Sequence, residues 1–265
     1  MDHTYIEEFQ SMDVAKTYVE EIVDGYKSED ILCLFDIDLT LLEPSNPAVQ
    51  YVNIIKHKEI WFDLKKRYAC FSPAMCGAVA LVDKHEILDQ DVFKLLHFLN
   101  ERKIRNLGFT ATLNVKIEGK DLREIRYQQL KENNISFEQH FPQQEVILDS
   151  VKLLGNFPCI YKGIIFSHGN GACPNKGVVL PEFLKLLDKK PKCIIFFDDN
   201  FDNLLDVNQH LAETNPDIDF YGILFTKAHY KKTSEVSAEE FEKTWKGYFQ
   251  RESLFCKKSE RKNCF

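Results

Sequence analysis

In ILCLFDIDLT, residues 31–40, an unbroken apolar run leads directly into a polar run with two aspartates. Unbroken apolar runs are typical of parallel strands that helices cover on both faces. Further apolar runs follow at 104–109, 145–148, 193–197 and 220–225. The sequence therefore predicts a mostly parallel sheet built from these strands.

Stretches with helical spacing separate the strands. Apolar residues recur three and four positions apart within them, which is typical of the buried face of an amphipathic helix. The stretches are 89–102, 120–133, 176–187 and 201–212. Strand alternating with helix predicts an α/β fold with a doubly wound, mostly parallel sheet.

Three segments depart from this alternation. YKGIIFSHGNGACPNKG, residues 161–177, combines an apolar run with several glycines and predicts a hairpin that leads into a helix. Residues 1–25 mix acidic side chains into a helical pattern. Near the other end, Ser237 is followed by Glu240, which is the pattern of a capping box and predicts a helix through Phe249.

The chain has 265 residues, enough for two domains or for one core with an insertion. The interval between the first two predicted strands is far longer than one crossover helix needs. We therefore expect a small, mainly helical cap at 42–88, inserted into a catalytic core formed by 1–41 and 89–250. A basic tail, 251–265, would follow; a solvated tail is the favoured interpretation, and contact with a membrane is the alternative.

Composition and charge exclude several classes of protein. With 44% hydrophobic and 28% charged residues, the chain has the composition of a globular protein. Its 34 basic and 41 acidic residues leave a net charge of −7, which argues against nucleic acid as a partner. There is no membrane-spanning apolar run or recognisable signal peptide, and the eight cysteines form no C-x-x-C pair. We expect a cytoplasmic protein, with delivery into a host cell as a further option.

Asp36, Asp38 and Thr40 follow the first strand, where the carboxyl ends of parallel strands form the ligand crevice. Alternate residues of an extended segment point to the same side, so both carboxylates are expected to face that crevice. One carboxylate can attack a phosphorus atom while the other transfers protons to the leaving oxygen and from water. The alternative is a polar turn in which the aspartates bind backbone amides.

A second pair of acids, Asp198 and Asp199, follows the strand at 193–197. Two acid-bearing strand ends that are neighbours in a sheet make an oxygen-rich site of the kind that Mg²⁺ prefers. Thr110 after the second strand and Lys176 at a helix start can hold a phosphate. A cation is required because the carboxylates would otherwise repel a phosphate dianion.

In this order, from DxDxT through a Thr-ending strand and a helix-start Lys to a strand ending in DD, the chain resembles the haloacid dehalogenase superfamily of phosphohydrolases over residues 30–226. The resemblance implies a Rossmannoid core with a cap. It also implies that Asp36 is a nucleophile that forms an aspartyl-phosphate, and that Asp38 is the general acid and base. Thr110 would bind the phosphoryl group, and Lys176 would contact both nucleophile and phosphate.

The same resemblance implies a magnesium site. Asn203 matches a position that orients either the lysine or the second acid. The metal ligands would be Asp36, Asp38 through its backbone carbonyl, Asp199, and Asp198 close by.

Substrate contacts are expected from four polar residues and from the cap. The polar residues are Thr40, Thr110, Lys176 and His168, although His168 is equally suited to a turn that binds its own backbone. Aromatic residues of the cap offer a slot for an aryl phosphate such as phosphotyrosine, with packing between helices as their more common role. They are Trp61, Phe62, Tyr68 and Phe71.

More narrowly, IRNLGFTAT and the predicted hairpin resemble a little-characterised bacterial branch of that superfamily, a domain-of-unknown-function family of intracellular bacteria. That branch often has Arg two residues after the motif threonine. This chain has Thr112 there, which leaves open what contact this position makes with the substrate.

These features predict a Mg²⁺-dependent phosphomonoester hydrolase that acts through an aspartyl-phosphate on a phosphorylated small molecule or phosphoprotein. The acid at Asp38 favours a phosphatase or phosphotransferase over a dehalogenase within the superfamily. Two alternatives stay open: a phosphotransferase or mutase with the same nucleophile, and a non-catalytic binding protein with this fold.

Overall fold

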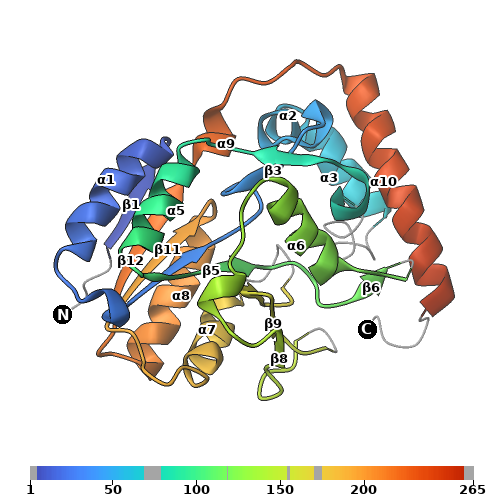
Figure 1. Ribbon diagram of the computed structural model, residues 1–265. Coiled ribbons are helices and arrows are strands. Elements are labelled where there is room, and N and C mark those ends of the chain that lie inside the picture. Colours follow the sequence, from blue (N-terminus) through green and yellow to red (C-terminus); the bar gives the residue numbers. More distant parts are fainter. Residues whose placement is uncertain (1–4, 69–78, 118, 154–155, 170–174, 260–265) are drawn as a thin grey trace.

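A computed structural model describes residues 5–68, 79–117, 119–153, 156–169 and 175–259. Its centre is an eight-stranded sheet with the order β1-β12-β11-β2-β5-β10-β9-β8 (Figure 1). The six strands from β1 to β10 in this order run parallel, and β9 and β8 are antiparallel to their neighbours. The strands are β1 (Tyr5–Phe9), β2 (Ile31–Phe35), β5 (Arg105–Thr110), β8 (Glu145–Ile147), β9 (Cys159–Tyr161), β10 (Ile164–Phe166), β11 (Cys193–Asp198) and β12 (Asp219–Phe225).

Helices cover both faces of the sheet, as the unbroken apolar strands predict. Cys33 and Phe35 of β2 belong to the core cluster that α1 and α5 complete on one face. Leu32 and Leu34 belong to the cluster that α7 and α8 complete on the other. The doubly wound, mostly parallel α/β architecture is therefore confirmed. The helices are α1 (Met12–Val23), α5 (Val92–Glu101), α6 (Leu122–Glu132), α7 (Lys176–Leu184) and α8 (Phe201–Thr214).

The N-terminal segment differs from its prediction. Tyr5–Phe9 is not helical but forms β1, an edge strand that pairs in parallel with β12. The helical pattern begins only at Met12, where α1 starts. Glu7 and Glu8 suit an edge strand, since charged residues there oppose pairing with another chain, but they resemble the acidic start of a helix in the sequence. The predicted hairpin before α7 is confirmed by the antiparallel pairing of β9 with β10.

The inserted segment, residues 42–88, leaves and re-enters the core through the antiparallel pair β3 (Leu42–Pro44) and β4 (His85–Ile87). Between them lie α2 (Tyr51–Lys56) and α3 (Lys58–Arg67). These helices pack against the C-terminal helix α10 (Ala238–Ser259), which lies along them in Figure 1. Leu64 and Trp245 are buried in this shared cluster, and Trp245 Nε1 donates a hydrogen bond to the Ala48 carbonyl at 2.9 Å.

The contacts of α10 correct one prediction and decide between two others. The helix continues to Ser259, beyond the predicted end at Phe249 and into the segment interpreted as a tail. For two of the four aromatic residues the structure shows packing between helices, the role given as the more common one: Trp61 packs edge-to-face on Trp245 and Tyr68 stacks on Phe249. Phe62 is 59% exposed, and Phe71 lies outside the described residues. Ser237 Oγ accepts the Glu240 N–H at 3.2 Å, as the capping box predicts.

No helix in the described part of the chain is both long enough and apolar enough to span a membrane. The side chains of the basic C-terminal tail lie outside the described residues.

Asp89 joins three helices at the point where the chain re-enters the core. Its carboxylate accepts the N–H groups of Met12 at 3.0 Å and Asp91 at 3.1 Å, and it pairs with Lys227 at 2.7 Å. Burial alone would raise the pKa of Asp89, but these hydrogen bonds outweigh it and lower the pKa. A lowered pKa means that ionised Asp89 stabilises the fold above the ordinary carboxyl range, and that this contribution is lost as the pH falls through the folded-state pKa.

We expect Asp89→Asn to lower the free energy of unfolding by about 1–3 kcal/mol near neutral pH, because an amide cannot replace the charged acceptor. The difference from wild type should shrink as the pH falls through the lowered pKa of Asp89. Urea unfolding at neutral and acidic pH measures both effects. Asp13→Asn is the control, since Asp13 is an exposed acid that pairs with Lys94; a pH-independent loss in Asp89→Asn would contradict the assignment.

Candidate active site

The site lies at the carboxyl ends of β2 and β11, which are parallel neighbours. Asp36 follows β2, and its N–H donates to the Phe197 carbonyl at 2.8 Å, which extends the pairing by one residue. Asp198 ends β11, and Asp199 comes next. Carboxylate oxygens of these three aspartates lie within 4.8 Å of one another, and we call them the carboxylate cluster.

Lys176 is the cation of the carboxylate cluster. Its side chain is 1% exposed, and Nζ lies 2.6 Å from Asp36 Oδ1 and 2.7 Å from Asp198 Oδ2. Burial alone would lower the pKa of Lys176, but the two carboxylates outweigh it and raise the pKa, so the side chain stays charged. The rings of Phe109 and Phe196 pack around the ammonium, with centroids 5.4 and 5.1 Å away.

The start of α7 places Lys176 against the strands. Gly177 allows this placement because α7 and α8 approach closely there: an added Cβ would lie 2.4 Å from the Asp206 carbonyl oxygen. The Gly177 N–H also donates to the Asp206 carboxylate at 2.6 Å, which ties the first turn of α7 to α8. The packing of α7 on α8 therefore sets the helix-start position of the lysine.

Asp198 and Asp199 differ in what they already bind. Asp198 is fully buried, and its carboxylate accepts hydrogen bonds from the Asn200 N–H at 2.9 Å and from the Asn203 side chain at 3.0 and 3.2 Å, besides Lys176. Asn203 thus orients Asp198, and among the two roles that its position implies the contact is with an acid rather than with the lysine. Asp199 contacts His229 at 3.3 Å, with its side chain 16% exposed. Asp36 and Asp199 are consequently the members of the cluster with more room for a further ligand.

The electrostatics of the carboxylate cluster favour a cation. Three carboxylates face one buried lysine, so the group carries an excess of negative charge. Burial raises the pKa of the Asp36 carboxyl well above its usual range, with Lys176 opposing the rise and the neighbouring aspartates adding to it. Burial also raises the pKa of Asp199. An all-oxygen donor set of this kind suits a hard divalent cation such as Mg²⁺.

Asp38 stands apart from the carboxylate cluster. It lies in a tight turn, where Leu39 has a φ of 61° and its N–H donates to the Leu42 carbonyl at 2.8 Å. The Asp38 side chain is 41% exposed and pairs with Arg126 of α6 at 2.6 Å. Its carboxylate is therefore held at the edge of the site rather than among the other acids. A metal contact through the backbone carbonyl of Asp38 stays a prediction.

Three residues predicted to contact the substrate are buried, and they differ in their hydrogen-bond partners. Thr110 Oγ1 lies 3.0 Å from Thr112 Oγ1 and accepts the Thr112 N–H at 3.1 Å. Thr40 is as fully buried as Thr110, and its hydroxyl has no hydrogen-bond partner within the described ranges. His168 is 2% exposed, has a φ of 53°, and accepts the Asn114 N–H at 2.9 Å through Nδ1. A backbone-binding role thus describes His168 better than a substrate contact.

Three residues of the site come from segments without a motif. Arg126 lies on α6, Tyr51 begins α2, and His229 belongs to α9 (Lys227–Tyr230). The Tyr51 and His229 rings stack with centroids 4.0 Å apart, and a pocket of about 430 Å³ beside Asp199 is lined in part by both rings and by Tyr230. No sequence motif marks these three residues as part of a site, because only the folding of the chain brings them to the strand ends.

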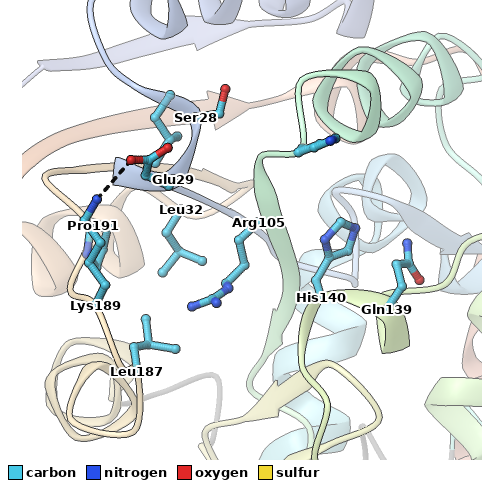
Figure 2. A pocket seen from close by; sticks show the side chains of 11 residues that line it. Ser28, Glu29, Leu32, Arg105, Gln139, His140, Leu187, Lys189 and Pro191 are labelled. Atoms are coloured by element: carbon cyan, nitrogen blue, oxygen red, sulfur yellow. Dashed lines mark hydrogen bonds and ion pairs between the residues drawn. The ribbon is translucent and has the colours of Figure 1, made fainter.

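A second pocket, of about 330 Å³, lies at the opposite end of the strands (Figure 2). Leu32, near the start of β2, lies on its floor, and Arg105 at the start of β5 points into it. Lys189 contributes a second cation, which pairs with Glu29 at 3.4 Å. Because parallel strands have all their carboxyl ends at one edge, this pocket is remote from the carboxylate cluster.

Comparisons with known proteins give a family. A search of the curated proteins and a search of the solved structures found no match. Residues 8–254 match the model of a family described as a protein of unknown function (DUF2608). Since this match covers nearly all of the sequence, the chain belongs to the DUF2608 family.

Proposed function

We propose that the protein is a Mg²⁺-dependent phosphomonoester hydrolase that forms an aspartyl-phosphate on Asp36. The observation that carries the proposal is the contact of one buried lysine, Lys176, with both Asp36 and Asp198 at adjacent strand ends. A structural ion pair needs one carboxylate, whereas this lysine has two and a third acid, Asp199, beside them. The resemblance of the motif order to the haloacid dehalogenase phosphohydrolases supports the same chemistry.

The reaction divides between two aspartates. The Asp36 carboxylate attacks the phosphorus atom, its new P–O bond forms as the ester P–O bond breaks, and Asp38 gives a proton to the departing alcohol. Asp38 then takes a proton from a water molecule that attacks the aspartyl-phosphate, which releases inorganic phosphate and restores Asp36. The exposed edge position of Asp38 is suited to both proton transfers, because the leaving alcohol and the water arrive from solvent.

Asp36 and Asp199 would hold the cation, with Asp198 beside them oriented by Asn203. Bound there, Mg²⁺ would neutralise the charge that keeps a phosphate dianion away from three carboxylates. Lys176 supplies a second positive charge at the Asp36 oxygen, and Thr110 lies at the end of the adjacent strand β5. The pocket beside Asp199, with Tyr51 and Tyr230 in its wall, is suited to an aryl or other small-molecule leaving group.

The test is release of phosphate from 4-nitrophenyl phosphate by the purified chain, with Mg²⁺ and with EDTA. We expect turnover with Mg²⁺ and its loss with EDTA. A second set of reactions contains an acceptor alcohol, because transfer of the phosphoryl group to the alcohol instead of water would identify a phosphotransferase. Absence of turnover on a panel of aryl, sugar and nucleotide phosphates would contradict the proposal.

A further inference from the structure

Arg126 is a fully buried guanidinium at the edge of the proposed site. It lies on α6, and only 2% of its side chain is exposed. Nη2 is 2.6 Å from Oδ1 of Asp38. Among the residues that the structure describes, Asp38 is the one acid within ion-pair distance of Arg126. A buried charge without a partner is strongly unfavourable, so the two side chains hold each other in place.

The other nitrogens of the Arg126 guanidinium also have acceptors. Nε lies 3.2 Å from Thr112 Oγ1, and Nη1 lies 2.9 Å from Gln129 Oε1. Nη1 is also 3.2 Å from Nε2 of His85. The guanidinium is planar and its donors have a fixed geometry, so contacts on all sides leave it one orientation. Asp38 therefore pairs with a guanidinium whose orientation is fixed by its other contacts.

His85 connects this guanidinium to the inserted segment. It is the first residue of β4, and burial, together with the Arg126 charge, lowers the pKa of His85 to about 4. The ring is therefore neutral near neutral pH. Nε2 lies 3.2 Å from Arg126 Nη1, and Nδ1 lies 3.0 Å from both the Asp83 carbonyl oxygen and Gln129 Nε2. A continuous chain of contacts runs from the inserted segment through Arg126 to Asp38.

The same guanidinium reaches the residues at the end of β5. Thr112 Oγ1, which accepts from Arg126 Nε, lies 3.0 Å from Thr110 Oγ1. Thr112 stands where an arginine was expected from the resembling branch, and α6 brings the Arg126 guanidinium to its hydroxyl. The arginine thus touches both sides of the site, the proton-transferring acid and the predicted phosphoryl-binding strand end.

We infer that Arg126 is the positioning residue of Asp38, and that through His85 it makes the placement of this acid depend on docking of the inserted segment. The inference rests on the proposed function. Arg126 does not touch the reacting atoms in this role; it fixes the direction from which Asp38 meets the leaving oxygen. Loss of this direction affects proton donation, which matters only when the leaving group is a poor one.

The test compares two substrates that differ in their need for a proton. The leaving group of 4-nitrophenyl phosphate departs as a stable phenolate, whereas an alkyl phosphate must be protonated as its ester bond breaks. We expect Arg126→Lys to lower kcat/KM for the alkyl ester by about 100-fold and that for the nitrophenyl ester by about 3-fold or less. In Arg126→Gly, added methylguanidine should restore part of the alkyl activity.

Arg123→Lys is the matched control, since Arg123 lies on the same helix but pairs with Asp121 and Glu145. This control should leave the ratio of the two substrates unchanged. Equal losses on both esters in Arg126→Lys, with the protein folded by circular dichroism, would overturn the inference.

If the Arg126 variants do not fold, His85→Leu is the variant that tests the inference. It keeps the ion pair and removes one acceptor of the guanidinium, so we expect a smaller loss that is again selective for the alkyl ester; a uniform loss would overturn the inference. If the wild type turned over neither the nitrophenyl ester nor the alkyl ester, the proposed function would be contradicted instead.

Discussion

Asp36→Asn is expected to abolish turnover of 4-nitrophenyl phosphate, with kcat lower by at least about 10⁴-fold, because the amide cannot form the acyl-phosphate bond. The substitution preserves shape and hydrogen bonding at a buried position where burial already raises the pKa of the acid. The variant should therefore fold. Steady-state kinetics with saturating Mg²⁺, alongside thermal unfolding of both proteins, measures this difference.

Asp202→Asn is the matched control for Asp36→Asn. Asp202 lies in the first turn of α8, close in sequence to the acids of β11, but its side chain is exposed and outside the carboxylate cluster. Its replacement should leave kcat within about 2-fold of wild type, as surface substitutions usually have small effects. Comparable rates for wild type and Asp36→Asn would exclude Asp36 as the nucleophile, whatever the source of the activity.

Lys176→Met is expected to produce the largest loss of stability. It removes a buried cation that contacts both Asp36 and Asp198, and breaking a buried ion pair by removing one partner costs about 3–5 kcal/mol. In this variant the three carboxylates lose the positive charge of Lys176, so a bound divalent cation should stabilise it more than it stabilises wild type. Urea unfolding of both proteins with Mg²⁺ and with EDTA measures the two effects.

Lys185→Met provides the comparison for Lys176→Met, since Lys185 caps the C-terminal end of α7 and its side chain is 63% exposed beside Glu182. Its free energy of unfolding should change by less than about 1 kcal/mol, because exposed ion pairs contribute little. A Lys176→Met variant as stable as wild type in EDTA would show that the carboxylate cluster does not require a cation. This measurement needs no substrate and is independent of turnover.

Much of the site could be predicted because its acids directly follow apolar runs that the sequence identifies as strands. Apolar runs at 31–35 and 193–197 become β2 and β11, and parallel neighbours necessarily bring Asp36 to Asp198 and Asp199. The contact of Lys176 with Asp36 is what the family resemblance implies, and the structure places the two charged groups 2.6 Å apart. Residues in these segments are constrained locally, by continuous burial and by the direction of the strand.

Other contacts could not be predicted, because they depend on how distant segments pack. The edge strand β1 carries acids that resemble a helix start, and only its pairing with β12 gives it an extended conformation. Trp61 of the inserted segment packs on Trp245 of α10, a partner almost two hundred residues away that the sequence pattern does not identify. Helical spacing predicts which face of a helix is buried, but it does not predict the segment against which that face packs.

Local pattern is enough to predict the apolar strands and the acids at the ends of two of them, because continuous burial marks each strand separately. That β2 and β11 lie side by side, and so bring Asp36 to Asp198, depends on the tertiary structure. The tertiary structure also determines which acid stands apart. Asp38 leaves the carboxylate cluster because Arg126, buried on α6 and bound to His85, has no other acid within reach in the described ranges. A buried guanidinium needs a counter-charge, and tertiary packing rather than local sequence pattern determines which acid lies within its reach.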